Sequence, residues 1–108
     1  MSNNACFVLN LYKSISDIYF LKASNELCTH KETIETLDEC QSAIGYLKRN
    51  GLDIEYKHED KNGGNPKGCY AAESNDLFGT SDSKEGVWNP HCVGASHSES
   101  QPICKIGE

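Results

Sequence analysis

The sequence predicts an α+β fold, with one amphipathic helix packed on a small antiparallel sheet, stapled by disulfides and rimmed by long polar loops. Six cysteines are spread over 108 residues with no C-x-x-C pair. This pattern is typical of a disulfide-stabilised small domain and not of a zinc knuckle or a thioredoxin-type redox site. A single capped helical segment stands among short strand-like segments. The hydrophobic fraction of 37% allows only a modest core, which disulfides commonly supplement in small domains.

The charge and the apolar runs exclude several classes of partner. Ten Lys and Arg against sixteen Asp and Glu give a net charge of −6. Nucleic acid and anionic membrane surfaces bind basic proteins, so we expect neither as a partner. No stretch approaches the ~20 apolar residues of a membrane span. Residues 5–11 are apolar but have no basic leader, so they do not form a signal peptide. Because the cysteines favour an oxidising compartment, we expect a mature or truncated form of an exported chain.

The first 24 residues are predicted to form an N-terminal β-hairpin extension. Residues 6–12 and 15–23 are rich in β-branched and aromatic side chains and are expected to form its two strands. Residues 25–108 are expected to form the cysteine-rich α+β domain itself, as a single compact unit.

A helix is predicted from Leu37 to Arg49. Thr36 and Glu39 fit a capping box, in which each side chain bonds the backbone amide of the other residue. Basic residues and an Asn-Gly pair end the segment, as expected at a helix C-terminus. Gly45 weakens the helix and suggests close packing against a sheet. Four side chains recur at helical spacing and form one apolar stripe: Leu37, Cys40, Ile44 and Leu47. The stripe directs Cys40 inward.

Short strands and polar loops follow the helix. Alternating apolar and charged residues over 52–57 predict a half-buried strand. Shorter strands are expected at 68–72, 86–89 and 102–106, separated by charged or polar loops at 58–67, 73–85 and 90–101. Loops of that length without structure of their own are usually functional or tied down.

The candidate metal ligands match no known site. Residues 60–65 begin like an EF-hand loop, but glycine is not at the sixth position and the glutamate expected at the twelfth is missing. Four histidines are candidates for zinc ligation: His30, His58, His91 and His97. Their spacing from the cysteines matches no known zinc finger. We expect no bound metal and no cofactor.

The one local feature of the sequence that suggests nucleophilic catalysis is the adjacent pair His91 and Cys92. A catalytic cysteine needs a histidine beside its sulfur and a group that orients that histidine. Side chains adjacent in sequence seldom point at each other, and a disulfide would consume the thiol. We therefore expect no catalytic residues and no enzyme activity.

Four residues are candidates for binding. Tyr70 and Trp88 could stack on sugar rings, with Asn89 as a polar partner, in a carbohydrate-binding module. Both rings fall in expected strands, where core packing is the more common outcome. Phe78 stands alone in a polar loop and is the better candidate for an exposed contact.

Ordered motifs from Thr36 onward carry a resemblance to a family. They are Thr36-x-x-Glu39-Cys40-x-x-Ala43, Pro66-x-Gly68-Cys69-Tyr70, Val87-Trp88-Asn89-x-His91, Gly94 and Pro102-Ile103-Cys104-Lys105. The chain resembles a short cysteine-rich domain that recurs in proteins of marine unicellular algae and some animals, and the likeness covers about residues 26–107. The family has no established activity, and the resemblance implies an extracytoplasmic interaction module. A helix disulfide-bonded onto a sheet is also similar, by analogy only, to PAN/apple domains.

The resemblance also bears on the disulfide pairing, for which six cysteines allow fifteen arrangements. The family pattern holds the cysteines at positions 28, 40, 69 and 104, which implies that the two additional ones form the pair Cys6–Cys92. Among the other four we favour Cys40–Cys69, because the helix stripe faces the sheet. The pair Cys28–Cys104 would then close the ends of the domain.

The expected function is a non-catalytic structural or interaction module, an accessory subunit that contacts other protein subunits in a larger assembly. We expect it in an extracytoplasmic location: secreted, at the cell surface or in an organelle lumen. Two alternatives stay open at this point: an extracellular carbohydrate-binding module, and an intracellular thiol or metal-binding protein with reduced cysteines.

Overall fold

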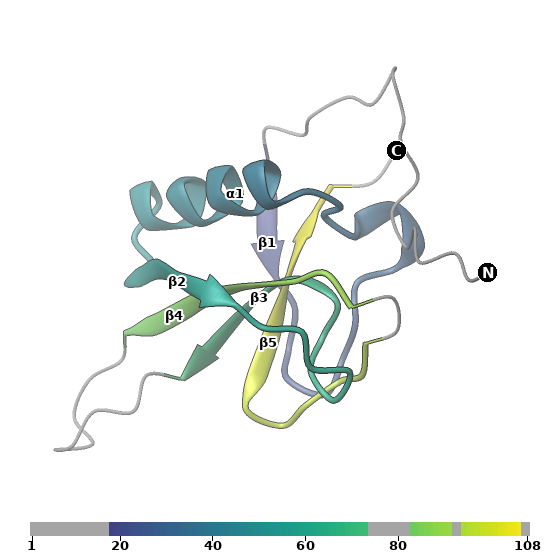
Figure 1. Ribbon diagram of the computed structural model, residues 1–108. Coiled ribbons are helices and arrows are strands. Elements are labelled where there is room, and N and C mark those ends of the chain that lie inside the picture. The colour runs from purple at the N-terminus through teal and green to yellow at the C-terminus, as the bar shows by residue number, and fades with distance from the viewer. Residues whose placement is uncertain (1–17, 74–82, 92–93, 107–108) are drawn as a thin grey trace, which may run out of the picture.

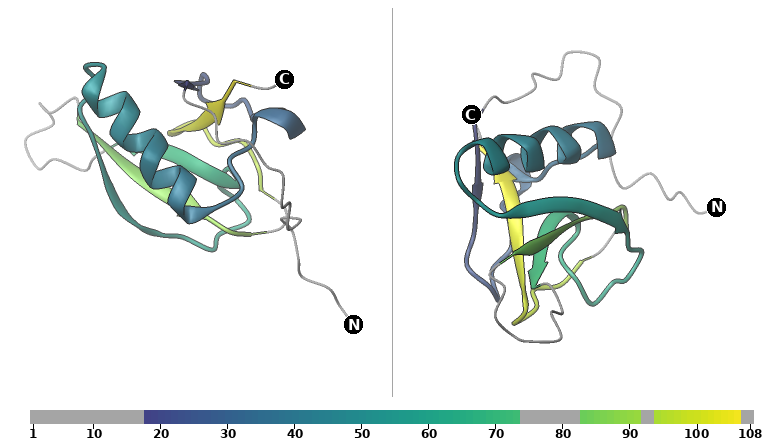
Figure 2. Two further views of the ribbon diagram at one scale, coloured as in Figure 1. Left: turned by 90° about the horizontal axis from the view of Figure 1, so that it is seen from above. Right: turned by 90° about the vertical axis from the view of Figure 1, so that its left-hand side faces the viewer.

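The computed structural model describes residues 18–73, 83–91 and 94–106, and it confirms the α+β class (Figure 1). The elements in chain order are β1 (Tyr19–Leu21), a 3-10 turn η1 (His30–Glu32), α1 (Leu37–Arg49), β2 (Ile54–Glu59), β3 (Gly68–Glu73), β4 (Lys84–Asn89) and β5 (Ser100–Lys105). The strands form one five-stranded sheet in the order β1-β5-β3-β4-β2. The helix α1 lies over one face of this sheet, as both views of Figure 2 show.

The sheet is mixed, whereas the sequence predicted an antiparallel one. The pairs β1–β5, β3–β5 and β3–β4 are antiparallel, but β2 and β4 are parallel. The difference arises because β4 returns from β3 into the position between β3 and β2. There it runs in the same direction as β2, and a shift of register between Tyr56 and His58 accommodates the pairing.

The predicted bounds of the helix are confirmed, but only half of the capping box forms. The Thr36 hydroxyl accepts a hydrogen bond from the Glu39 amide at 3.1 Å. The Glu39 carboxylate does not return to Thr36. It turns inward, where Oε2 accepts a hydrogen bond from the Tyr19 hydroxyl at 3.0 Å and Oε1 lies 3.9 Å from the Lys105 ammonium. Only 3% of Glu39 is exposed, so this residue links α1 to β1 and β5.

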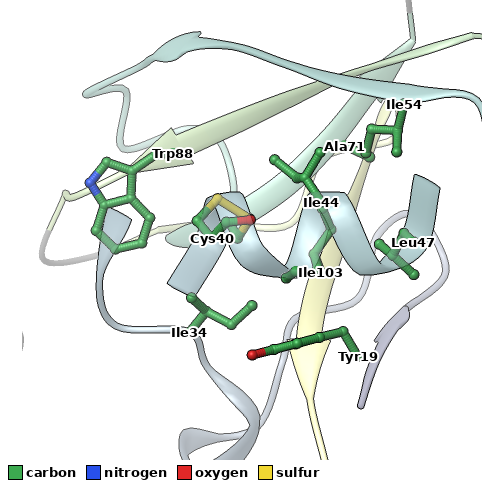
Figure 3. Packing of buried hydrophobic residues seen from close by; sticks show 11 residues of the cluster. Tyr19, Ile34, Cys40, Ile44, Leu47, Ile54, Ala71, Trp88 and Ile103 are labelled. Atoms are coloured by element: carbon green, nitrogen blue, oxygen red, sulfur yellow. A yellow bond between two sulfur atoms is a disulfide. The ribbon is translucent and has the colours of Figure 1, made fainter. Parts of the chain in front are cut away.

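The hydrophobic core lies between α1 and the sheet (Figure 3). It consists of Tyr19, Ile34, Cys40, Ala43, Ile44, Leu47, Ile54, Cys69, Ala71, Trp88 and Ile103. The predicted disulfide Cys40–Cys69 is present and joins the helix to the central strand β3. The inward orientation of the apolar stripe therefore brings a covalent bond to the middle of the core.

A close approach between helix and sheet occurs at Gly86 in β4. A Cβ atom added at Gly86 would lie 2.3 Å from Cδ1 of Ile44, which is far inside van der Waals contact. A Cβ atom at Gly45 would meet only the flexible side chain of Arg49, at 3.3 Å. The interpretation of Gly45 as a packing position is therefore wrong, and it is Gly86 that lets the helix approach the sheet.

The second predicted disulfide, Cys28–Cys104, is also present, on the sheet face opposite α1. It fastens the segment after β1 to β5, while Thr33 forms an isolated bridge with Cys104. The third expected pair, Cys6–Cys92, lies outside the described residues. The strand β1 pairs with β5 as an edge strand, and its expected hairpin partner, residues 6–12, also lies outside them. The division at residue 24 stays a prediction.

We predict that Gly86→Ala lowers the free energy of unfolding by about 1–3 kcal/mol, because the new methyl group overlaps Ile44. Ile44→Val removes the atom that clashes, so the double variant should recover part of the loss. Denaturant unfolding with the disulfides intact measures both effects.

Gly45→Ala is the matched control. It should leave the protein as stable or raise stability by about 0.5–1 kcal/mol, since alanine favours a helix over glycine. If the changes in the free energy of unfolding caused by Gly86→Ala and Ile44→Val simply add in the double variant, the alanine methyl group and Ile44 do not clash.

Candidate functional site

A pocket of about 300 Å³ opens beside η1, on the side of the domain held by Cys28–Cys104. Its lining residues come from the segment that precedes α1 and from two loops: Leu27, Cys28, His30, Thr33, Glu35, Lys67 and Gly94. The lining residues therefore combine a leucine and a disulfide-bonded cysteine with residues that carry an imidazole, a hydroxyl, a carboxylate and an ammonium group.

The wall that carries η1 is fixed by local hydrogen bonds. The Thr29 amide donates to the Glu32 carboxylate at 3.0 Å, and the Thr33 hydroxyl donates to the Thr29 carbonyl at 2.8 Å. Lys22 lies 3.2 Å from the same carboxylate. The hydrogen bond from the Thr29 backbone, assisted by Lys22, holds the pKa of Glu32 below its usual value. These contacts shape the turn before any ligand is present.

The opposite wall depends on a close contact between two backbone segments at Gly94. A Cβ atom at Gly94 would lie 2.2 Å from the Lys67 nitrogen and 2.9 Å from the Asn65 carbonyl oxygen. The Ala95 amide donates to that same carbonyl at 3.1 Å. Only glycine fits here, and the contact holds Gly94 and Lys67, two of the lining residues, next to each other.

Asn89 organises the loop behind that wall. Its side-chain amide donates to the carbonyls of Asn62 at 2.9 Å and Pro66 at 3.0 Å, and its oxygen accepts from the His91 amide at 3.0 Å. Asn89 is fully buried. A buried amide that satisfies several backbone groups at once is a structural element of the loop and not a surface contact.

Asp60 anchors the start of the same loop. One of its carboxylate oxygens accepts from the Tyr70 hydroxyl at 2.7 Å and from the Asn65 amide at 2.8 Å. The Asp60 amide donates to the Trp88 carbonyl at 2.8 Å. Burial of the phenol, reinforced by its hydrogen bond to the Asp60 carboxylate, raises the pKa of Tyr70 well above its usual value. Tyr70 therefore stays neutral and donates a hydrogen bond over the whole physiological range of pH.

The structure does not support the binding roles expected of three residues. Tyr70 is 3% exposed, Trp88 6% and Asn89 0%, so neither ring offers a face on which a sugar could stack. Their places in β3 and β4, beside Cys69 and Gly86, explain the burial. The fourth candidate, Phe78, lies outside the described residues.

The candidate metal ligands among the described residues are not brought together. Among the residues that the structure describes, no group of three or more His, Cys, Asp or Glu side chains could hold a metal ion. His30 lines the pocket, whereas the His91 ring lies against Gly63. Cys92, the suggested partner of His91, lies outside the described ranges. Within those ranges no helix has both the length and the apolar character needed to span a membrane.

Sequence reasoning missed Leu27, which is 43% exposed at the edge of the pocket. Polar residues precede Leu27 in the sequence, so no apolar pattern marks its segment. A single large apolar residue beside a cysteine in that segment was the available signal. Together with His30, Glu35 and Lys67, it gives the pocket the chemistry to accept a side chain that is apolar in part and polar at its end.

Comparison with known proteins found no matching protein-family model, no matching curated protein and no matching solved structure. The function must therefore be argued from the site itself.

We predict that Tyr70→Phe lowers the free energy of unfolding by about 1–2 kcal/mol, because the Asp60 carboxylate loses a buried hydrogen-bond donor. Tyr56→Phe on the edge strand β2 is the control and should change stability by less. Urea unfolding at neutral pH compares the two. An equal loss in both variants would mean that the bond to Asp60 does not stabilise the loop.

Proposed function

We propose that this chain is a non-catalytic interaction module, an accessory subunit that contacts another protein through the pocket beside η1. The disulfides make it a small stabilised module, and what we propose in addition is that it acts by contact with another protein. The observation that carries it is Leu27, a large apolar side chain exposed at the edge of a pocket whose walls are already fixed.

The properties of this pocket suit contact with a protein side chain. Protein interfaces concentrate their binding energy in a few anchor residues that fill pockets and are surrounded by polar groups. Here Leu27 supplies the apolar surface, and His30, Glu35 and Lys67 supply the polar surroundings. The Cys28–Cys104 bond and the hydrogen bonds of η1 reduce the entropy lost on binding, because the site needs little rearrangement.

The alternatives receive less support. A carbohydrate-binding module would need an exposed aromatic face, and Tyr70 and Trp88 are both buried. An intracellular thiol or metal protein would need reduced cysteines, yet Cys28, Cys40, Cys69 and Cys104 are all paired. Intramolecular disulfides are typical of oxidising, extracytoplasmic compartments. We therefore place the module in such a compartment, and the resemblance to an extracytoplasmic cysteine-rich domain agrees with this.

A photo-crosslinking residue at position 30, inside the pocket, tests the proposal in the native host. We predict one discrete adduct with a protein partner. Leu27→Asp should reduce its yield roughly tenfold or more, the loss expected from an anchor residue. Leu27 is exposed, so the same substitution should leave the unfolding transition nearly unchanged.

Ile18→Asp is the matched control, since Ile18 is also exposed but does not line the pocket. It should leave the adduct intact. An adduct that survives Leu27→Asp, or no adduct at position 30, would remove the pocket as the contact surface. Phe78 would then be the next residue to substitute.

A further inference from the structure

The two disulfides of the described residues differ in their access to solvent. Cys40 is 0% exposed and Cys69 is 1% exposed, so the bond between them lies inside the core (Figure 3). In the second bond Cys104 is 0% exposed, but Cys28 is partly exposed and lines the pocket. Of these four cysteines, Cys28 is therefore the one that a molecule in the pocket would meet first.

This asymmetry matters because thiol–disulfide exchange depends on access to one sulfur atom. The reaction begins when a thiolate attacks a disulfide sulfur and forms a mixed disulfide, so which sulfur can be reached decides where the adduct forms. A pocket of about 300 Å³ has room for a small thiol. Attack at Cys104 or at the Cys40–Cys69 bond would first require the core to open.

We propose that the pocket is a modification site, at which a small-molecule thiol exchanges with the Cys28–Cys104 disulfide. The thiolate sulfur bonds to Sγ of Cys28, the Cys28–Cys104 bond breaks, and its electron pair leaves on Sγ of Cys104. The proton lost by the incoming thiol is balanced by one taken up at Cys104. The products are a mixed disulfide on Cys28, seated in the pocket, and a buried thiol at Cys104. A second thiol can then release Cys28 as a thiol, with the small molecule leaving as its own disulfide.

The rest of the structure permits this exchange without unfolding. The segment after β1 keeps its hydrogen bonds to the β5 region, from the Lys22 amide to the Pro102 carbonyl at 2.9 Å and from the Asn25 amide to the His97 carbonyl at 3.2 Å. Thr33 keeps its bridge to Cys104, and Cys40–Cys69 still joins α1 to the sheet. This exchange does not depend on the protein partner proposed above, because it concerns only the chemistry of Cys28, which lines the pocket.

The test is a time course of the native full-length chain with a neutral monothiol, 2-mercaptoethanol. Samples are alkylated, digested and analysed by mass spectrometry, so that each cysteine peptide is followed separately. We expect Cys28–Cys104 to open at least about tenfold faster than Cys40–Cys69, because only the former offers an accessible sulfur. The mixed disulfide should appear on Cys28 and not on Cys104.

Two variants test whether the thiol enters through the pocket. Leu27→Ala removes an apolar side chain from the pocket edge and should accelerate exchange severalfold. Ile18→Ala, at an exposed position that does not line the pocket, should leave the rate unchanged. The inference is overturned if both disulfides open together, since that would indicate global unfolding. An adduct on Cys104, no reaction of the native chain, or a rate that Leu27→Ala does not change would overturn it as well.

Discussion

The contact between α1 and the centre of the sheet is the constraint on which the other features depend. The Cys40–Cys69 bond fixes the helix to β3, and the missing side chain at Gly86 lets Ile44 approach β4 closely. With the helix held at this distance, Glu39 is enclosed next to Tyr19 and Lys105. Burial of an ionised side chain is costly unless hydrogen bonds and opposite charge compensate it. The polar junction therefore favours one placement of β1 and β5 under the start of the helix.

On the other face of the sheet, Cys104 holds together the segments around the pocket, as the Cys40–Cys69 bond holds α1 to β3. It pairs with Phe20 in the sheet, forms a bridge with Thr33 and bonds covalently to Cys28. Three separate segments therefore meet at one buried residue. The same arrangement leaves Cys28 partly exposed among the residues that line the pocket.

Local signals allowed the sequence to predict the helix, and the two disulfides followed from the helix stripe together with the family resemblance, whereas other features that depend on distant residues were missed. The cap at Thr36 and the Asn-Gly stop act within a few residues, so the bounds of α1 followed directly. The parallel pairing of β2 with β4 depends on where β3 has already been placed, and no local pattern encodes it. The direction of the Glu39 side chain depends in the same way on Tyr19, twenty positions away. Of the pocket, the sequence singled out Cys28 as a disulfide cysteine and considered His30 only as a zinc ligand that it then rejected. It passed over Leu27, because exposure beside a cavity is a tertiary property.

Five of the residues that carry the resemblance to a cysteine-rich family have structural roles in this domain. Thr36 caps α1, Cys40 and Cys69 join the layers, Asn89 holds the loop behind the pocket, and Gly94 permits the contact of two backbones. Such residues specify a fold, and many functions can be built on one fold. Leu27, His30 and Glu35, which give the pocket its chemistry, lie outside those motifs. The motif residues therefore support the scaffold of this domain, whereas the chemistry of the pocket depends on side chains outside them.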